Sequence, residues 1–223
     1  CFIPNIYIVY KSSNSIKKNT VMKKTKYKKV FSMGLHSGVR NYTVEDLINI
    51  KGKKKLTQIN VTNPEEAAAC EEAGIDLIIA GPPSPLREIR EAAPKTFFTV
   101  GINWLEHSNK ESAIKQALQY MELGIDSIHC GCWNINFIKY LNEFRIPFQG
   151  HVGFVPMRST WTGGMKPYGK TSDEAKKIFD DIKELENLGA WGVEIECIPE
   201  KIMKEIDIST NLVTISIGSG KNA

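Results

Sequence analysis

Hydrophobic positions along the chain fall into two alternating patterns from residue 43 onward. Short runs that are apolar throughout are typical of strands, and the segments between them carry apolar residues at helical spacing. We expect strands at residues 56–61, 75–80, 97–103, 126–132, 148–153, 191–197 and 213–218. We expect helices at residues 44–50, 64–73, 86–92, 111–123, 137–144, 172–188 and 200–206. This alternation predicts a parallel sheet whose two faces are both buried.

Polar residues and glycines mark the ends of the expected helices. Thr43 is followed three residues later by Asp46, which approximates a capping box, and Asn63 before Pro64 gives an N-cap with proline at the first helical position. A glycine follows three of the helices, at positions 74, 124 and 189. Glycine readily takes the left-handed conformation that a chain needs when a helix turns into a strand.

The count of seven strands leaves two architectures open. A barrel of the TIM type needs eight strands, so it would lack its last one here, whereas a doubly wound open sheet would tolerate seven.

Length and charge suggest a basic extension followed by one domain. Residues 1–44 carry nine Lys and Arg and no acidic residue, and the remainder holds 20 basic and 25 acidic residues. We expect residues 1–42 to be a disordered extension and residues 43–223 to form the barrel domain. The mildly acidic remainder does not indicate nucleic-acid binding.

Cysteine number and hydropathy point to the cell interior. The five cysteines are an odd number without a recurring spacing, which fits reduced thiols, and no apolar run reaches the length of a membrane span. We therefore expect a cytoplasmic protein that does not bind membranes. Organellar targeting by the basic N-terminus is the alternative.

The residues best suited to chemistry lie between positions 150 and 199. Two expected strands end in ionisable side chains, His151 in Gly150-His151-Val152-Gly153 and Glu196 in a later run. The carboxyl ends of parallel strands are where barrel enzymes place their sites. Glu194 lies two residues before Glu196, so both carboxylates share one face of the strand. We expect the two to couple and the pKa of one to rise; the alternative is that Glu194 pairs with a Lys or Arg near the barrel floor.

These motifs resemble the ketopantoate hydroxymethyltransferase family, which belongs to the phosphoenolpyruvate mutase and isocitrate lyase superfamily of barrels. The similarity covers about residues 43 to 220 and rests on the order and spacing of several pieces. They are Gly150–Gly153, Gly163-Gly164 through Gly169 to Asp173-Glu174-Ala175, Gly189-Ala190, Glu196-Cys197-Ile198-Pro199 and Ile217-Gly218-Ser219-Gly220. The resemblance favours the TIM-type (β/α)8 barrel, without its last strand, over the open sheet.

The resemblance implies a reaction and two site residues. The family adds a hydroxymethyl group from methylenetetrahydrofolate to 3-methyl-2-oxobutanoate, in pantothenate biosynthesis, with Mg²⁺ on the substrate's oxygens. A metal on the carbonyl oxygen stabilises the enolate that forms when the neighbouring carbon loses its proton. The family's proton-transferring glutamate matches Glu196, and its substrate-binding histidine matches His151.

The family's metal-binding carboxylates have no match here. Its first aspartate falls on Pro82, its second on Gly101, and its Lys-Ile-Glu segment becomes His129-Cys130-Gly131. Proline and glycine offer no side-chain oxygen, and Mg²⁺ needs oxygen ligands. We therefore assign no metal ligand from the family pattern.

Three further features are candidates for binding. His129 shares the inward face expected for the site, so we assign it with His151 to substrate binding, while Cys130 faces the covering helices. Gly163, Gly164 and Lys166 form a candidate anion-binding loop over the mouth. Strand parity alone also raises the hypothesis that His129, His151 and Glu196 form a two-histidine, one-carboxylate site for a transition metal.

Three functions remain open from the residues. The first is hydroxymethyl transfer to a small 2-oxo acid. The second is another enolate-type carbon–carbon or carbon–phosphorus reaction on a 2-oxo acid, and the third is a barrel homologue that has lost catalysis. The missing carboxylates favour the second and third, and the intact region from Gly150 to Pro199 favours the first. We favour an enzyme, and the resemblance implies a homo-oligomer.

Overall fold

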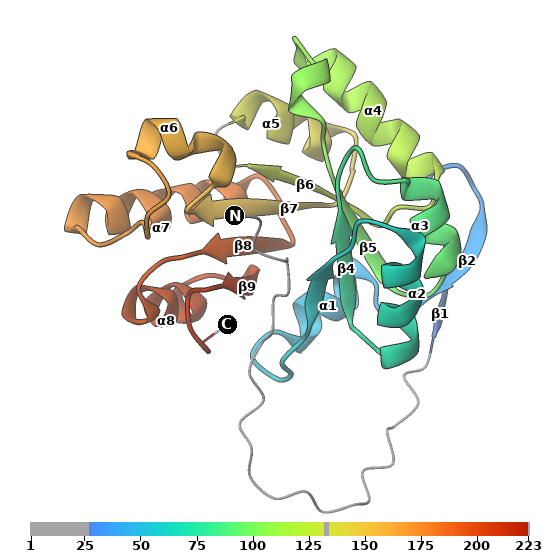
Figure 1. The fold of residues 1–223 in the computed structure, drawn as a ribbon, viewed down its shortest axis with the longest axis horizontal. Coiled ribbons are helices and arrows are strands. Elements are labelled where there is room, and N and C mark those ends of the chain that lie inside the picture. The colour runs from blue at the N-terminus through green and yellow to red at the C-terminus, as the bar shows by residue number, and fades with distance from the viewer. Residues whose placement is uncertain (1–26, 132–133, 223) are drawn as a thin grey trace, which may run out of the picture.

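The fold alternates strands and helices along nearly its whole length (Figure 1). The structure is a computed structural model that describes residues 27–131 and 134–222. The strands are β1 (Lys28–Phe31), β2 (Ser37–Arg40), β3 (Gln58–Asn60), β4 (Leu77–Ala80), β5 (Phe97–Gly101), β6 (Ser127–Gly131), β7 (Phe148–Gly153), β8 (Gly192–Glu196) and β9 (Val213–Ile217). The helices are α1 (Val44–Ile50), α2 (Pro64–Ala73), α3 (Leu86–Ala92), α4 (Lys110–Glu122), α5 (Ile135–Glu143), α6 (Ser159–Thr162), α7 (Ser172–Asn187) and α8 (Glu200–Ser209), with short 3₁₀ turns η1 (Trp104–Glu106) and η2 (Pro156–Arg158).

Seven parallel strands, β3 to β9, form one sheet in the order of the chain. The larger helices lie outside this sheet, and the strands curve around a common interior (Figure 1). Within the described residues β9 and β3 are not paired, so the barrel stays open at one seam. The predicted TIM-type barrel with seven strands is therefore confirmed. No helix in this part of the chain is long and apolar enough to span a membrane.

The predicted elements are confirmed with small differences at their ends, and the local signals explain their limits. Thr43 and Asp46 form a capping box at the start of α1, and the Asn63 side chain accepts the backbone N–H of Glu66 at 2.8 Å at the start of α2. Gly74 ends α2 with a φ of 75°, a conformation that costs a residue with a Cβ far more than glycine.

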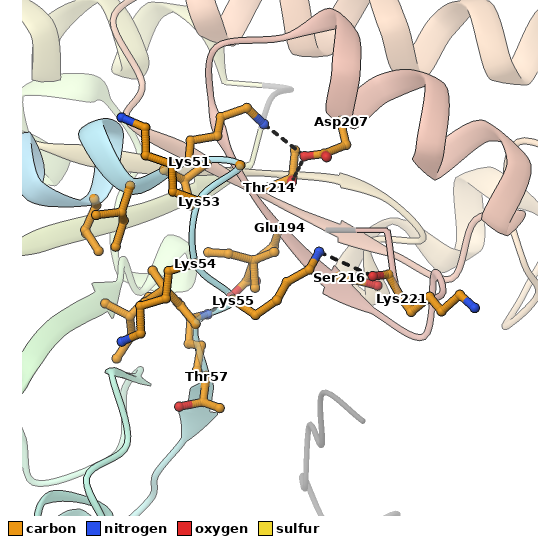
Figure 2. Close-up of a pocket in the computed structure, with 18 of the residues that line it drawn as sticks. Lys51, Lys53, Lys54, Lys55, Thr57, Glu194, Asp207, Thr214, Ser216 and Lys221 are labelled. Atoms are coloured by element: carbon orange, nitrogen blue, oxygen red, sulfur yellow. Dashed lines mark hydrogen bonds and ion pairs between the residues drawn. The ribbon is translucent and has the colours of Figure 1, made fainter. Parts of the chain in front are cut away.

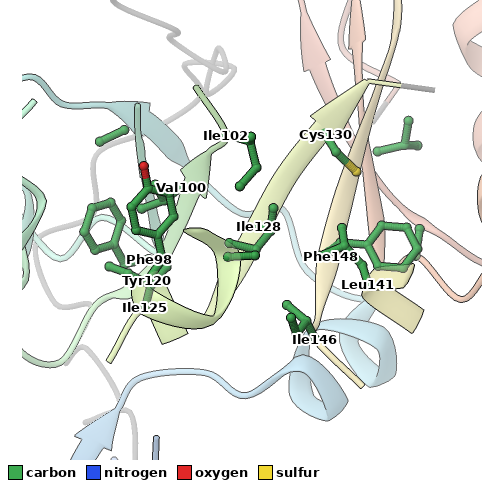
Figure 3. Packing of buried hydrophobic residues seen from close by; sticks show 14 of the residues in the cluster. Phe98, Val100, Ile102, Tyr120, Ile125, Ile128, Cys130, Leu141, Ile146 and Phe148 are labelled. Carbon is green, nitrogen blue, oxygen red and sulfur yellow. The ribbon is translucent and has the colours of Figure 1, made fainter. Parts of the chain in front are cut away.

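The main core lies between the sheet and its helices (Figure 3). Phe98, Ile128 and Phe148 project outward from β5, β6 and β7 and are fully or almost fully buried. Cys130 lies in the same layer, as predicted from strand parity. Outward apolar residues at every second position leave the alternate residues of each strand for the barrel interior.

A smaller cluster closes the amino-terminal end of the barrel. Leu47 of α1 packs with Leu77, Phe97 and Trp191, all buried. The Phe97 and Trp191 rings meet edge to face with centroids 5.4 Å apart, and the Trp191 indole donates to the Ser127 hydroxyl at 2.7 Å. The interior below the carboxyl ends of the strands therefore has an apolar floor.

The extension predicted to be disordered over residues 1–42 is ordered in its last part. Strands β1 and β2 pair as an antiparallel hairpin, and Arg40 at the end of β2 is buried. Residues 1–26 lie outside the described residues. The charge pattern gives no sign of the hairpin, because its stability comes from contacts of Arg40 with distant parts of the chain.

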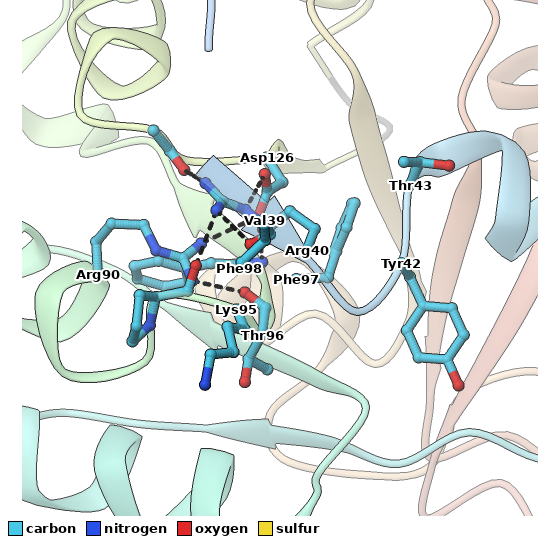
Figure 4. A network of polar contacts seen from close by, with 12 residues as sticks. Val39, Arg40, Tyr42, Thr43, Arg90, Lys95, Thr96, Phe97, Phe98 and Asp126 are labelled. Atoms are coloured by element: carbon cyan, nitrogen blue, oxygen red, sulfur yellow. Dashed lines mark hydrogen bonds and ion pairs between the residues drawn. The ribbon is translucent and has the colours of Figure 1, made fainter. Parts of the chain in front are cut away.

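Arg40 anchors this hairpin to the barrel floor (Figure 4). Its Nε donates to the two Asp126 carboxylate oxygens at 2.8 and 2.9 Å, and its two terminal nitrogens donate to the carbonyls of Pro94 and Gly124, each at 2.8 Å. Arg90 also donates to Asp126, at 3.0 Å. Burial lowers the pKa of Arg90 to about 10, although the charge of Asp126 opposes this shift.

Candidate functional site

Four ionisable side chains meet inside the barrel near the carboxyl ends of three neighbouring strands. His151 of β7 lies beside Glu194 of β8 in the sheet register, and Glu196 follows two residues later on the same face. His129 comes from β6, where Gly131 is the register partner of His151. Because β6, β7 and β8 are adjacent and parallel, residues at matching heights project into one space.

The two glycines around His151 explain why the motif is Gly-His-Val-Gly. A Cβ on Gly150 would lie 2.4 Å from a methyl carbon of Leu185 in α7. A Cβ on Gly153 would lie 2.4 Å from the carbonyl oxygen of Glu196, and Gly153 also has a φ of 85°. Both glycines therefore allow β7 to approach its neighbours closely enough to place His151 against Glu196.

The backbone that follows Glu196 is held in an unusual conformation. Cys197 has a φ of 48°, in the left-handed region that residues with a Cβ rarely occupy. Its N–H donates to the Ile217 carbonyl at 2.7 Å, and its carbonyl accepts from Tyr168 at 3.0 Å. The next N–H, of Ile198, donates to the Ser219 hydroxyl at 3.0 Å. These hydrogen bonds fix the backbone directly after Glu196 and so the direction of its side chain. Strained backbone of this kind concentrates at functional sites.

The first polar pair is the one that the motifs predict. His151 Nε2 lies 3.1 Å from Glu196 Oε2, and the two side chains are 10% and 13% exposed. With Nε2–H donating to the carboxylate, the ring is oriented and the second oxygen of Glu196 stays available. A positioned carboxylate next to an imidazole can accept and return a proton.

The second pair lies deeper in the barrel and joins His129 of β6 to Glu194 of β8. His129 Nε2 is 2.9 Å from Glu194 Oε2, but it is not aligned for a hydrogen bond. Gln58 of β3 donates to the other oxygen, Glu194 Oε1, at 2.5 Å. Among the described residues the partners of Glu194 are thus a histidine and an amide, in place of the Lys or Arg considered from the sequence.

The pKa of Glu194 moves opposite to the direction expected for a coupled carboxylate pair. Burial by itself raises this pKa, but the charges of His129 and His151 and the Gln58 hydrogen bond together lower it below its ordinary value. The expectation of a raised pKa is therefore wrong for Glu194, because strand parity shows the two carboxylates on one face but does not show the imidazoles between them.

Several buried polar atoms around this cluster have no hydrogen-bond partner in the described part of the chain. They include both amide atoms of the fully buried Gln149, the Thr99 hydroxyl and Gln58 Oε1. The sequence reasoning missed Gln58 and Gln149. Gln149 could have been found by parity, because it precedes His151 by two residues on β7, whereas nothing in the sequence joins Gln58 to Glu194.

The candidate anion-binding loop follows α6 at the surface. Gly163 and Gly164 have φ values of 86° and 95°, and both are exposed together with Lys166. Among the described residues, no hydrogen bond or ion pair joins these three to His151 or Glu196. Tyr168 and Gly169, a few residues later, attach the loop beside Cys197 and Ile198. The role of the loop stays a prediction.

The positions that match the Mg²⁺ ligands expected from the resemblance lie at the carboxyl ends of strands. Pro82 lies just beyond β4, and Gly101 and Gly131 end β5 and β6, so all three stand at the carboxyl ends of strands where ligands would be expected. None carries a side-chain oxygen. A hard cation that depends on oxygen ligands does not fit these residues.

A cavity of about 330 Å³ lies along the open seam rather than at the His151–Glu196 pair (Figure 2). It is lined by the segment that follows α1 and by β9, and Glu194 and Gln58 border it from the interior. Several of its lysines are already engaged: Lys51 pairs with Asp207, and Lys55 donates to the Lys221 carbonyl. This cavity therefore connects the deeper polar pair with the seam.

Together, the fold and the site define a parallel β/α barrel with a carboxylate–imidazole pair at the carboxyl ends of its strands. The sequence model of the ketopantoate hydroxymethyltransferase family matches residues 84–223. The chain belongs to this family.

Relatives agree with this assignment, and solved structures share the fold. The chain is 29% identical over 201 residues to the 3-methyl-2-oxobutanoate hydroxymethyltransferase of Kosmotoga olearia, covering 80% of this chain and 75% of the relative. It is 28% identical over 202 residues to that of Thermosipho africanus, covering 80% and 76%. In fold it is similar to the phosphoenolpyruvate phosphomutase of Streptomyces platensis subsp. rosaceus, with a TM-score of 0.54, 10% identity and coverage of 78% of this chain and 72% of that one.

Proposed function

We propose that this protein forms an enolate of a small 2-oxo acid and adds a one-carbon unit to it, as in the hydroxymethylation of 3-methyl-2-oxobutanoate. The observation that carries the proposal is the 3.1 Å contact between His151 and Glu196 at the carboxyl ends of β7 and β8. Family membership supports the substrate class, and methylenetetrahydrofolate is the co-substrate that it implies.

The pair is suited to moving a proton from carbon. In the proposed step the Glu196 carboxylate takes the proton next to the keto group, and the electron pair moves to form the enolate. The His151 N–H stabilises Glu196 as an anion before the step and sets its orientation. The C–C bond then forms between the carbon that lost the proton and the one-carbon unit, whose two C–N bonds to the folate break with the uptake of one water molecule. The water oxygen becomes the hydroxyl, its two hydrogens go to the two folate nitrogens as tetrahydrofolate leaves, and the proton held by Glu196 returns to the new hydroxyl oxygen.

Burial makes this arrangement effective. Both side chains are mostly withdrawn from water, and charges in such a site interact more strongly than they do in bulk solvent. Glu196 is held by the backbone around it, because Gly153 of the neighbouring strand packs closely against it and Cys197 follows it in a fixed conformation. The carboxylate therefore needs no large reorganisation during the reaction. We assign substrate binding to His129 and His151 together.

The first experiment measures the enolate directly. Purified protein is mixed with 3-methyl-2-oxobutanoate in heavy water, and the loss of the proton signal at carbon 3 is followed by NMR, without added metal and with Mg²⁺, Mn²⁺ or Zn²⁺. We expect exchange in the unmodified protein, and we expect Glu196→Gln to slow it by about 10²–10⁴-fold, as is usual when a general base is removed.

Glu205→Gln is the matched control, because Glu205 is an exposed glutamate of α8 remote from the pair; its exchange rate should equal that of the unmodified chain. Exchange in the absence of any hydroxymethylated product would favour another enolate reaction on a 2-oxo acid. No exchange with any of the metals would contradict the proposal and indicate a barrel that has lost catalysis.

Two properties of the whole molecule are also predictions from the family. We expect a homo-oligomer, to be measured by light scattering on the purified protein, and a cytoplasmic location, to be measured with a tagged chain in its own cell.

A further inference from the structure

Two imidazoles and a carboxylate come together inside the barrel. One ligand atom from each of His129, His151 and Glu194 lies within 4.8 Å of the other two. The rings of the two histidines are tilted toward each other with centroids 5.3 Å apart. Nitrogen and oxygen donors gathered in this number are those that transition metals bind in proteins.

We propose that His129, His151 and Glu194 form a binding site for a divalent transition-metal ion of the zinc or iron type. The three residues come from β6, β7 and β8, so rigid elements hold them. The carboxylate differs from the one considered on strand parity alone, since Glu194 is the register partner of His151 and Glu196 is not.

The spacing fits a site that closes around its ion. Donors bound to one tetrahedral zinc at about 2.0–2.1 Å lie roughly 3.3 Å from each other. Because the donors lie no more than 4.8 Å apart, each has to move by at most about 1 Å, which small side-chain rotations supply without a change in the strands.

The groups behind the three donors are those that ordinarily support metal ligands. Gln58 holds Glu194 Oε1 at 2.5 Å, which leaves the other oxygen for an ion. Glu196 contacts a ring nitrogen of His151, and a metal-binding histidine usually has its second nitrogen engaged by a carboxylate or carbonyl. Glu196 is thus a positioning residue for this site as well as the proposed base.

An independent sign of a missing ligand is the set of unpartnered polar atoms on the same interior face. Gln149 is the register partner of His129, is fully buried, and has no hydrogen bond on either amide atom within the described residues. The Nε2 atom of His129 likewise has no aligned hydrogen-bond partner there. Native proteins rarely leave such atoms unsatisfied unless water or an ion completes the site.

The choice of ion follows from the donors. Imidazole suits zinc, iron, copper and nickel, whereas Mg²⁺ takes oxygen donors. Oxygen ligands are thus absent at positions 82, 101 and 131, and nitrogen ligands are present deeper in the barrel. A role for this ion in binding the oxygens of a 2-oxo acid rests on the proposed function. The binding of the ion itself is independent of the proposed function.

The test is metal binding itself, measured apart from activity. The purified chain is stripped with a chelator and titrated with Co²⁺ followed by visible absorption, and with Zn²⁺ and Mg²⁺ followed by calorimetry. We expect one equivalent of Co²⁺ with bands typical of nitrogen and oxygen donors, tight Zn²⁺ binding, and Mg²⁺ binding at least about 100-fold weaker.

Variants assign the ligands and separate this proposal from the proposed function. Glu194→Gln and His129→Asn should each weaken Zn²⁺ binding by at least about 100-fold, while His36→Asn, at an exposed histidine of the β1–β2 hairpin, should leave it unchanged. Glu196→Gln should slow deuterium exchange by about 10²–10⁴-fold yet retain the ion with at most about a 100-fold loss in affinity. Circular dichroism checks that each variant is folded. If Glu194→Gln does not fold, His129→Asn tests the site in its place.

Three results would overturn the proposal. They are equal Zn²⁺ affinity in folded Glu194→Gln, His129→Asn and unmodified protein, Mg²⁺ affinity that matches Zn²⁺, and a sulfur-to-cobalt charge-transfer band, which would assign the ion to a cysteine.

Discussion

The two ends of the barrel each hold a cluster of charged side chains, and the two clusters differ in how completely their polar atoms are hydrogen-bonded. At the floor, Asp126 accepts hydrogen bonds from Arg40, Arg90 and the Phe98 backbone, and the arginines reach further carbonyls (Figure 4). Near the mouth, Glu194 and Glu196 face two histidines, while neighbouring buried amide and hydroxyl groups have no partner in the described residues. At the floor one buried side-chain atom, Arg90 Nε, has no partner among the described residues, whereas near the mouth several such atoms gather around the two histidines.

The difference indicates what each cluster is for. A buried charge with a full set of partners joins segments that lie far apart in the sequence, here the hairpin, the segment before β5 and the start of β6. A buried polar group without a partner costs stability, and such a cost persists where a ligand completes the site. In barrels of this type the amino-terminal end contributes stability and the carboxyl-terminal end contributes chemistry.

The largest expected effect is at the floor. Asp126→Ala leaves Arg40 and Arg90 buried without their shared anion, so we expect the free energy of unfolding to fall by about 3–5 kcal/mol. Chemical denaturation measures the loss. At a temperature where the variant is folded, deuterium exchange on 3-methyl-2-oxobutanoate should stay near that of the unmodified protein; a loss of exchange in folded Asp126→Ala would show that the two ends are coupled.

An intermediate effect is expected inside the mouth, with opposite signs for two glutamines. Gln149→Met replaces an unpartnered buried amide by an apolar chain of similar length and should raise the free energy of unfolding of the metal-free protein by about 1 kcal/mol. Gln58→Met is the matched control, because it removes the donor to Glu194 and should lower that free energy by about 1.5–3 kcal/mol. Equal destabilisation by both substitutions would show that the Gln149 amide is satisfied in the folded chain, which would contradict the proposed difference between the floor and the mouth.

The smallest expected effect is the pH dependence that Glu194 confers. Its pKa is lowered in the folded chain, so its ionised form contributes stability that is fully present above its ordinary value of 4.5 and is lost as the pH falls through the folded pKa. Denaturation of metal-free unmodified protein and of Glu194→Gln at several pH values measures this. The difference in unfolding free energy, unmodified minus variant, should shrink below pH 4.5; a difference that does not change with pH would mean that the folded chain leaves this carboxyl unperturbed.

The order of elements could be predicted from local signals because those signals act over a few residues. The capping box at Thr43 and Asp46, the Asn63 cap and the glycine after α2 each fix an element by themselves. The hairpin could not be predicted in this way. Strands β1 and β2 lie in a basic segment without apolar alternation, and the Arg40 contacts that hold the second strand are 54 to 86 residues away in the chain.

The candidate site was predictable only in part, for a similar reason. Strand parity is a local property, so it placed His129, His151 and Glu196 on the inward face, and the Gly-His-Val-Gly motif marked the end of β7. Parity does not say which residues on different strands meet, because that depends on the register between strands. In the backbone register Glu194 is the partner of His151, yet the His151 ring contacts Glu196 two residues further along β8. The curvature of the sheet brings Gln58 across to Glu194.

The sequence by itself determined the parallel β/α architecture and the seven strands, and it predicted His151 and Glu196 as candidate site residues near the ends of β7 and β8. Only the tertiary structure decided which charges are paired. It joined Arg40 to Asp126 across 86 positions and Gln58 to Glu194 across 136. The physical reason is that backbone conformation follows from neighbours in the chain, whereas the strength and the direction of an electrostatic contact depend on distance in space and on the removal of water.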